Sequence, residues 1–260
     1  MSAAAGTAGF TLLKVGGSCL AERTGATAAA LPLPPGRLLV VHGYSARLAA
    51  VRAAFSVAER PYTSPSGVAS RFSDEGDVAA ARLAAFLDAR DLAAALAARG
   101  VAVTTLAGDR GALAGERKTR LRYRDGRTVR LARDDLSGKL TGVDRGRLDA
   151  AWGDARVLVL SPFLASGDGP LVCDADHAAA GVAVACGLAE LTLVSDSGAF
   201  RVDGHAVAEV TAAEIAPLLA HASGGMSKKL HAVRRALEGG VRRVLLRAPD
   251  GGAGTVFRAA

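Results

Sequence analysis

Short apolar runs alternate with alanine-rich stretches along the chain, and this alternation limits the possible folds more than any other feature. The apolar runs have the length of strands and no alternating polar face, which is typical of strands buried on both faces. We expect strands at Phe10–Val15, Arg37–His42, Val101–Leu106, Arg156–Leu160, Leu191–Val194 and Val241–Leu246. We expect helices at Asp77–Ala98, Asp176–Cys186 and Lys228–Leu237. Strands that alternate with helices predict an α/β protein whose mainly parallel sheet is covered on both faces.

The size and composition are those of a folded protein. The chain has 260 residues, of which 50% are hydrophobic and 22% charged. That length suits one large domain, or two lobes that share a sheet. The composition excludes a disordered chain, a collagen and a coiled coil. The loop Ser161–Gly169, rich in Pro, Gly and Ser, is the expected boundary between the lobes.

The apolar segments and the cysteines indicate the cellular compartment in which we expect the protein. No uninterrupted apolar run approaches the roughly 18 residues of a membrane span, and residues 1–9 lack the cationic start and apolar core of a signal peptide. We therefore expect a cytoplasmic protein without a membrane partner. Cys19, Cys173 and Cys186 are odd in number and form no CxxC, which argues against a disulfide framework and a zinc site. We expect them to be reduced packing residues.

Lysine is scarce in this chain, which carries 27 Arg and only 5 Lys. Arginine does not replace lysine where a compact ammonium is needed, so each lysine marks a position to examine for chemistry. The alternative for each is an ordinary surface side chain. The positions are Lys14, Lys118, Lys139, Lys228 and Lys229.

Positive charge is concentrated in one segment. Residues Arg117–Arg147 hold eleven Lys and Arg against four Asp, a net charge of +7 that equals the formal charge of the whole chain. Within it, residues alternate with period two around Asp125-Gly126, which predicts a hairpin with a type I′ turn.

The alternation predicts that Arg120, Arg122 and Arg124 share one face of this hairpin, while Leu121 and Tyr123 face the core. A solvated surface is one interpretation. Three aligned arginines repel one another, however, so an acidic partner is at least as good an explanation. Because Tyr123 is the only aromatic residue of the segment, base stacking on a single-stranded nucleic acid is disfavoured.

Two glycine motifs follow expected strands, where an open parallel sheet places its ligands. In Lys14-Val15-Gly16-Gly17-Ser18 the glycines allow backbone N–H groups to approach a phosphate closely. The motif is not a Walker loop, because Lys14 precedes the glycines. The second motif is Val41-His42-Gly43-Tyr44-Ser45.

A third glycine motif, Gly224-Gly225-Met226-Ser227-Lys228-Lys229, opens an expected helix. Its free N–H groups and the helix dipole favour an anion there, and Lys229 adds a mobile charge. Asp174-Ala175-Asp176 precedes another expected helix, and Ser195-Asp196-Ser197-Gly198 follows an expected strand. Carboxylates at a helix start are as often only caps.

In this order and spacing, the motifs resemble the amino-acid kinase family over about Phe10–Phe257. The resemblance implies a three-layer αβα sandwich of two lobes. Residues 1–165 would bind the acceptor and form a homodimer, and residues 166–260 would bind the nucleotide. It also implies ATP and Mg²⁺ as cofactors, without direct protein ligands to the metal.

The resemblance further implies roles for single residues. Lys14 and Lys229 would stabilise the transition state of phosphoryl transfer, and Asp176 would hold both ammonium groups in position. Arg71 would bind the α-carboxylate of the acceptor through its bidentate fork. The other acceptor-binding residues would be Gly43, Tyr44, Ser45 and Asp174. The phosphate-binding and nucleotide-binding residues would be Gly16, Gly17, Ser195, Asp196, Gly225 and Met226.

Within the family, the chain most resembles kinases that act on α-aminoadipate or glutamate attached to an amino-group carrier protein of the LysW type. The residues that carry this finer resemblance lie in Ser64–Asp74, Glu116–Thr119 and Asp135–Lys139. Such carriers are expected to be acidic, and Arg120, Arg122 and Arg124 would form their docking surface. We therefore expect an ATP-dependent kinase that forms an acyl phosphate on a carrier-linked amino acid.

Two residues depart from the family pattern on the acceptor side. Tyr44 stands where relatives have glycine, and Val172 stands where many have an acceptor-binding Asn. A positive φ at Tyr44 would strain the loop by about 1–3 kcal/mol; otherwise its ring projects into the acceptor pocket. Both changes predict an altered acceptor. The alternatives are an N-acetylglutamate kinase, a noncatalytic regulatory paralogue and a nucleic-acid binder.

Overall fold

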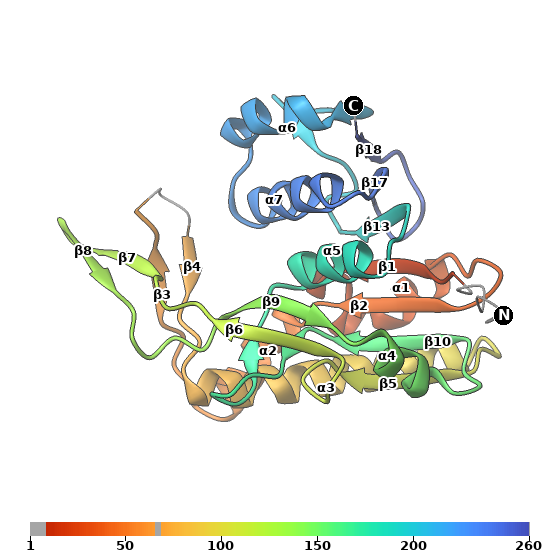
Figure 1. Cartoon of the computed structure of the whole chain (residues 1–260), viewed down its shortest axis with the longest axis horizontal. Coiled ribbons are helices and arrows are strands. Elements are labelled where there is room, and N and C mark those ends of the chain that lie inside the picture. Colours follow the sequence, from red (N-terminus) through yellow and green to blue (C-terminus); the bar gives the residue numbers. More distant parts are fainter. Residues whose placement is uncertain (1–8, 66–68, 260) are drawn as a thin grey trace, which may run out of the picture.

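The computed structural model describes residues 9–65 and 69–259. Its centre is a single sheet that runs through the whole molecule (Figure 1). The strands of this sheet are β1 (Thr11–Val15), β2 (Leu38–His42), β5 (Val103–Ala107), β10 (Val157–Ser161), β13 (Glu190–Val194), β16 (Glu209–Thr211), β17 (Arg243–Arg247) and β18 (Thr255–Arg258). Their order in the eight-stranded sheet is β16-β18-β17-β13-β1-β2-β10-β5.

The sheet is parallel from β17 to β5, and only β18 and its parallel neighbour β16 run in the opposite direction. The helices are α1 (Thr24–Ala30), α2 (Ser45–Ala54), α3 (Glu75–Ala97), α4 (Arg145–Trp152), α5 (Ala175–Ala185), α6 (Ala212–Leu218) and α7 (Gly224–Glu238), with 3-10 turns η1 (Gly17–Cys19), η2 (Ala21–Arg23) and η3 (Leu219–His221). Each predicted strand and helix is therefore present, with shifted ends.

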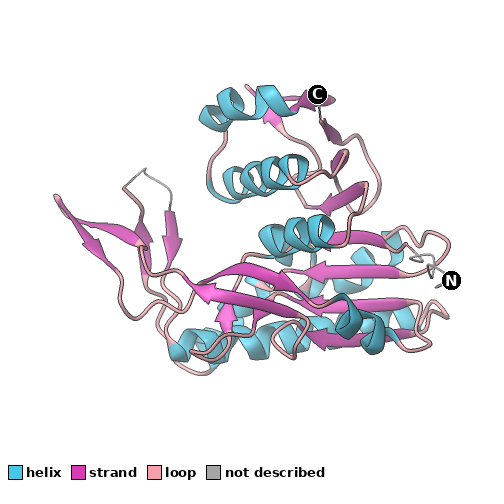
Figure 2. Ribbon diagram, viewed as in Figure 1, coloured by secondary structure: helices cyan, strands magenta, loops and turns pink. Residues whose placement is uncertain are grey.

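Both faces of the sheet are buried, which explains why its strands lack a polar face. On one face, Leu39, Val41 and Leu158 belong to a core that includes residues of α4, α5 and α7. On the other, Val40 and Val157 belong to a second core with residues of α1 and α3. The predicted αβα arrangement of layers is confirmed (Figure 2).

Short two-stranded ribbons surround the sheet. They are β3 (Pro61–Thr63) with β4 (Ala69–Arg71), β6 (Leu113–Arg117) with β9 (Gly138–Val143), β7 (Arg122–Asp125) with β8 (Thr128–Leu131), β11 (Phe163–Leu164) with β12 (Leu171–Val172), and β14 (Arg201–Val202) with β15 (His205–Ala206). The β3–β4 and β7–β8 ribbons project together from the body at the left of Figure 1. The expected boundary near residue 165 falls between β11 and β12, while β1 joins both halves of the sheet by pairing with β2 and β13.

The basic hairpin is present, but its turn differs from the prediction. The turn residues are Gly126 and Arg127, one position later than expected, and of these only Gly126 has a positive φ, +58°. A positive φ at the first turn residue alone is the type II′ pattern rather than type I′. Arg120 precedes β7 and so lies outside the paired strands.

The three cysteines lie in the described part of the chain and are buried with free thiols. Within residues 9–65 and 69–259, the structure contains no helix of the length and apolarity that crossing a bilayer would demand.

Candidate functional site

A buried carboxylate joins two lysines from distant parts of the chain. Lys14 of β1 places its Nζ 2.7 Å from Asp176 Oδ1. Lys229 of α7 places its Nζ 3.3 Å from Asp176 Oδ2. Lys14 and Asp176 are each 4% exposed. The structure therefore brings together Lys14, Lys229 and Asp176, three residues that the family resemblance implied to be neighbours.

The charges of this triad stabilise one another. Burial opposes ionisation of Asp176, but the Lys14 and Lys229 ammonium groups outweigh it, so the pKa of the carboxyl lies below its ordinary value. An ionised Asp176 in turn holds the two lysine side chains close together. The arrangement presents two ammonium groups side by side, which is what a transferring phosphoryl group requires.

The position of Asp176 follows from the cap of α5. Asp174 is the N-cap residue, and its Oδ1 accepts hydrogen bonds from the N–H groups of Asp176 at 2.9 Å and His177 at 3.2 Å. This cap fixes the first helical turn, from which Asp176 reaches the lysines. Asp174 thus has a structural role through Oδ1. Only its other oxygen, Oδ2, would be available for a contact with the acceptor.

Two glycine loops pack against each other beside the triad. A Cβ at Gly17 would lie 2.4 Å from the Ser45 nitrogen, and a Cβ at Gly43 would lie 2.7 Å from the Gly17 nitrogen. Both glycines are therefore required by close backbone contact. Ser45 is the first residue of α2, so its N–H has no acceptor within the helix.

Gly16 departs from its expected role. Its N–H donates to the Val194 carbonyl at 2.9 Å, extending the pairing of β1 with β13, so this group is not free to bind a phosphate. Gly17 has no such sheet bond and begins the η1 turn instead. Of the two glycines, only Gly17 therefore stays a candidate for the phosphate-binding role predicted for the pair.

Tyr44 adopts an unstrained backbone, since its φ is −142°. The ring is buried and lies parallel to Phe163, with 5.5 Å between ring centroids, and Val172 packs against the same cluster. Burial raises the pKa of the Tyr44 hydroxyl, while the nearby charge of Arg71 lowers it. The two departures from the family pattern thus meet in one apolar cluster that neighbours Arg71, and the strain considered for Tyr44 is absent.

The residues expected to bind the nucleotide lie at two element ends. Ser195 and Asp196 follow β13, with Ser195 buried and Asp196 exposed. Gly225 and Met226 lie in the first turn of α7, the helix that carries Lys229. The Met226 N–H donates to the Ser223 carbonyl at 3.1 Å, whereas a Cβ at Gly225 would meet open space. The contact between Lys229 and Asp176 links this helix start to the triad.

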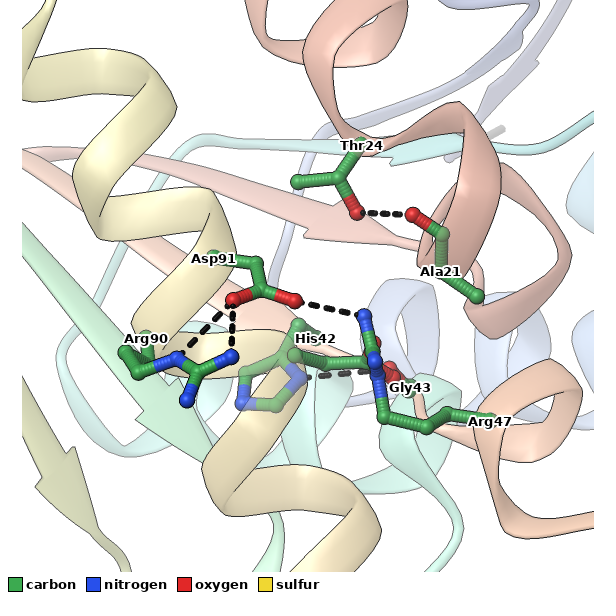
Figure 3. Close-up of polar contacts among 8 residues, drawn as sticks. Ala21, Thr24, His42, Gly43, Arg47, Arg90 and Asp91 are labelled. Atoms are coloured by element: carbon green, nitrogen blue, oxygen red, sulfur yellow. Dashed lines mark hydrogen bonds and ion pairs between the residues drawn. The ribbon is translucent and has the colours of Figure 1, made fainter. Parts of the chain in front are cut away.

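Sequence reasoning missed the network behind the glycine loops (Figure 3). Arg47 of α2 donates to Asp88 at 2.5 Å and to Asp91 at 2.7 Å, both on α3. Asp88 is fully buried, so this ion pair ties the start of α2 to the underlying helix. Two carboxylates spaced i, i+3 within an alanine-rich apolar helix are the signal that could have identified it.

The segments that carry the finer family resemblance include a structural node at Asp135. Its Oδ2 accepts from the Ser73 N–H at 2.9 Å, and its Oδ1 accepts from the Ser137 N–H at 2.8 Å. Asp135 is 2% exposed. The node connects the segment after β4 to the start of β9, so it holds the projecting ribbons on the body.

No group of three or more His, Cys, Asp or Glu side chains suited to a metal ion occurs among the residues that the structure describes.

Comparisons with known proteins agree with this geometry. A family model described as the amino acid kinase family matches residues 9–248. The chain is 29% identical over 238 residues to a Caldivirga maquilingensis protein named as a kinase of LysW-linked aminoadipate and glutamate, covering 90% of this chain and 91% of that protein. It is 37% identical over 106 residues to an acetylglutamate kinase of Rubrobacter xylanophilus, covering 40% and 42%.

The crystal structure of the Streptococcus mutans protein smu.665 shares the fold, with a TM-score of 0.75 and 19% identity over 96% of this chain and 98% of that one. The predicted phosphotransferase with an α/β sandwich fold is thus confirmed, since the family model spans nearly all of both halves of the sheet. The chain belongs to the amino acid kinase family.

Proposed function

We propose that this kinase uses ATP to phosphorylate the side-chain carboxylate of an amino acid linked to an acidic carrier protein. The single observation that carries the proposal is the buried triad in which Asp176 holds Lys14 and Lys229 together. The product would be an acyl phosphate.

Phosphoryl transfer to a carboxylate requires alignment and charge stabilisation, with no covalent enzyme intermediate. Lys14 and Lys229 would each contact equatorial oxygens of the moving phosphoryl group, and Asp176 would keep their ammonium groups fixed. The N–H groups of Gly17 and Ser45 would bind oxygens of the phosphoryl group and of the acceptor. Each contribution comes from a group already in place, which lowers the cost of reorganisation.

The nucleotide would lie between the end of β13 and the start of α7, against Ser195, Asp196, Gly225 and Met226. Both oxygens of the buried Asp176 are paired with lysines, so this carboxylate is not a free metal ligand. Mg²⁺ would therefore enter on the phosphates of ATP, whose charge it neutralises. The part played by this chain is to hold those phosphates beside Lys229.

The acceptor would lie on the side of Arg71 and of the loop Gly43–Ser45. Arg71 would bind the α-carboxylate, and Asp174 would contribute the carboxylate oxygen not used in the helix cap. Tyr44 and Val172 make this side more apolar than an amide at position 172 would. We infer that they adapt the pocket to a different acceptor side chain.

The carrier would dock on the projecting β7–β8 hairpin. Cross-strand register pairs Arg122 with Leu131 and Arg124 with Val129, so these four side chains share one face. Val129 is 51% exposed and Leu131 is 47% exposed. Cations around an exposed aliphatic pair complement an acidic protein surface that carries an apolar side chain. Arg120, just before β7, would extend the positive surface.

Two further points are part of the proposal. The family resemblance supports a homodimer, which sedimentation equilibrium measures directly. An N-acetylglutamate kinase is the competing function, because an acetylglutamate kinase is among the relatives. The exposed basic hairpin favours the carrier-linked acceptor, since a small free acceptor gives it no role.

The experiment that tests the proposal traps the acyl phosphate with hydroxylamine. The protein, ATP and Mg²⁺ are incubated with free N-acetylglutamate in one reaction and with a glutamate-loaded LysW-type carrier in another. Hydroxamate formed only with the carrier supports the proposal. Hydroxamate formed only with N-acetylglutamate supports the competing function, and ATP-dependent hydroxamate in neither reaction contradicts both.

A further inference from the structure

His42, the last residue of β2, is fully buried beside the glycine loops and has no role in the reaction outlined above. Its Nδ1 lies 3.1 Å from the Gly43 carbonyl oxygen, a contact drawn in Figure 3. Its Nε2 lies 2.9 Å from the Ser161 hydroxyl at the end of β10. Both ring nitrogens are therefore engaged, one by the loop and one by a neighbouring strand.

The partners fix the protonation of the ring. A carbonyl oxygen can only accept a hydrogen bond, so Nδ1 must carry the proton that it shares with Gly43. Burial lowers the pKa of His42 to about 4, an effect to which the nearby Lys14 charge adds. The ring is thus neutral near pH 7, and Nε2 accepts from the Ser161 hydroxyl. Only one tautomer satisfies both contacts.

This hydrogen bond controls the direction of the next peptide group. The Gly43–Tyr44 peptide is planar, so holding its carbonyl toward His42 turns the Tyr44 N–H the opposite way. The Gly43 N–H is itself held by the Val15 carbonyl at 2.8 Å. The Tyr44 nitrogen lies against Gly17, where an added Cβ would approach it to 2.8 Å. The loop therefore has little freedom to rotate while His42 stays in place.

We propose that His42 is a positioning residue that orients the Gly43–Tyr44 peptide, so that the N–H groups of Tyr44 and Ser45 face the transferring phosphoryl group. Ser161 holds the imidazole in the tautomer that this requires. The identity of the group that binds at the loop rests on the proposed function. The relay of hydrogen bonds from Ser161 through His42 to Gly43 is a property of the protein alone.

Two amide variants separate the two contacts of the ring. His42→Asn can place its amide N–H near the position of Nδ1 and keep the bond to Gly43, while His42→Gln can reach Ser161 but leaves the Gly43 carbonyl without its donor. We expect His42→Gln to lower kcat by about 10- to 100-fold, as for a donor misplaced by about an ångström, with the KM for ATP unchanged. His42→Asn, which keeps a donor for the Gly43 carbonyl, should keep most of kcat.

Equal losses of kcat in both amide variants, or no loss in either, would overturn the proposal. Circular dichroism and thermal unfolding show whether each variant folds. Should one of them fail to fold, ¹⁵N NMR of the wild-type imidazole still decides: a proton on Nδ1 at pH 7 agrees with the relay, and a proton on Nε2 overturns it. Measuring the tautomer by NMR needs no substrate. The result therefore tests the role of His42 even if the hydroxylamine experiment contradicts the proposed function.

Discussion

At the scale of single residues, the proposed phosphoryl transfer depends most on Lys14 and Lys229, the two lysines bound to Asp176. Their charges matter most in the transition state, so Lys14→Ala or Lys229→Ala should lower kcat by roughly 10²–10³-fold and leave the KM of the acceptor nearly unchanged. Steady-state kinetics with the acceptor identified by hydroxamate formation measures both constants. The control is Lys228→Ala, which removes the same side chain one position earlier on α7 and lies in no ion pair among the described residues. A change in KM with kcat unchanged would show that Lys14 and Lys229 are not catalytic residues.

Tyr44 tests the acceptor pocket at the same scale. Because its buried ring stacks on Phe163, Tyr44→Gly should lower the free energy of unfolding by about 3–5 kcal/mol, as for other large aromatic truncations. If the folded variant keeps ATP binding, we expect its preference among acceptors to change. Tyr44→Phe removes only the hydroxyl and should keep both stability and preference. Identical preferences in wild type and Tyr44→Gly would show that the ring serves packing alone.

At the scale of elements, sequence alone identifies the buried strands best. Six strands of the sheet were predicted because β1, β2, β5, β10, β13 and β17 are short segments rich in leucine and β-branched residues. The sequence did not reveal β16 and β18, which lie at the sheet edge and are antiparallel to the other strands. Both are short and mix apolar with charged residues. The sequence also placed the hairpin turn one residue early, because the choice between Asp125-Gly126 and Gly126-Arg127 depends on the register of β7 and β8, which the alternating pattern does not fix.

The candidate site shows the same limit. The residue types of Lys14, Asp176 and Lys229 were recognisable in the sequence, because each lies near the end of an expected strand or the start of an expected helix. The engagement of Gly16 with β13 was not, because it depends on the register of two strands about 180 residues apart in sequence. The pairing of His42 with Ser161 is equally long-range, with a separation of 119 residues. Sequence motifs thus indicate which residues are candidates for the site. The register of the strands decides which of their N–H groups and side chains are free to bind a ligand.

The basic hairpin is the element whose function is most open to test. Replacing Arg120, Arg122 and Arg124 by Gln should raise the KM for carrier-linked substrate and flatten its dependence on salt, because long-range attraction is screened beyond about 8 Å at 0.15 M ionic strength. Turnover of a small free acceptor, where one is used, should hardly change. The matched control replaces Arg201, Arg234 and Arg242, which removes the same charge far from the hairpin in sequence. If the two triple variants show the same KM and salt dependence, the hairpin is only a solvated surface.

At the scale of the whole molecule, the sheet places charged and neutral buried groups side by side, and their titrations should separate along the pH axis. Asp176 has a lowered pKa in the fold, so its contribution to stability is present above its ordinary pKa of 3.8 and is lost only as the pH falls below that value. His42 behaves differently, because its pKa falls from 6.5 to about 4. Between these two values the unfolded chain binds a proton that the folded chain excludes, so stability falls as the pH is lowered.

We therefore expect the free energy of unfolding in urea to be lower at pH 5 than at pH 7 by up to about 2 kcal/mol through His42 alone. Burial lowers the pKa of His177 as well, which adds a loss in the same direction. His42→Gln removes the titrating group and should reduce the difference in stability between pH 7 and pH 5. Equal pH dependence in the wild type and in His42→Gln would mean that His42 is protonated alike in the folded and unfolded chains, and the neutral ring assigned to the relay beside Gly43 would be wrong.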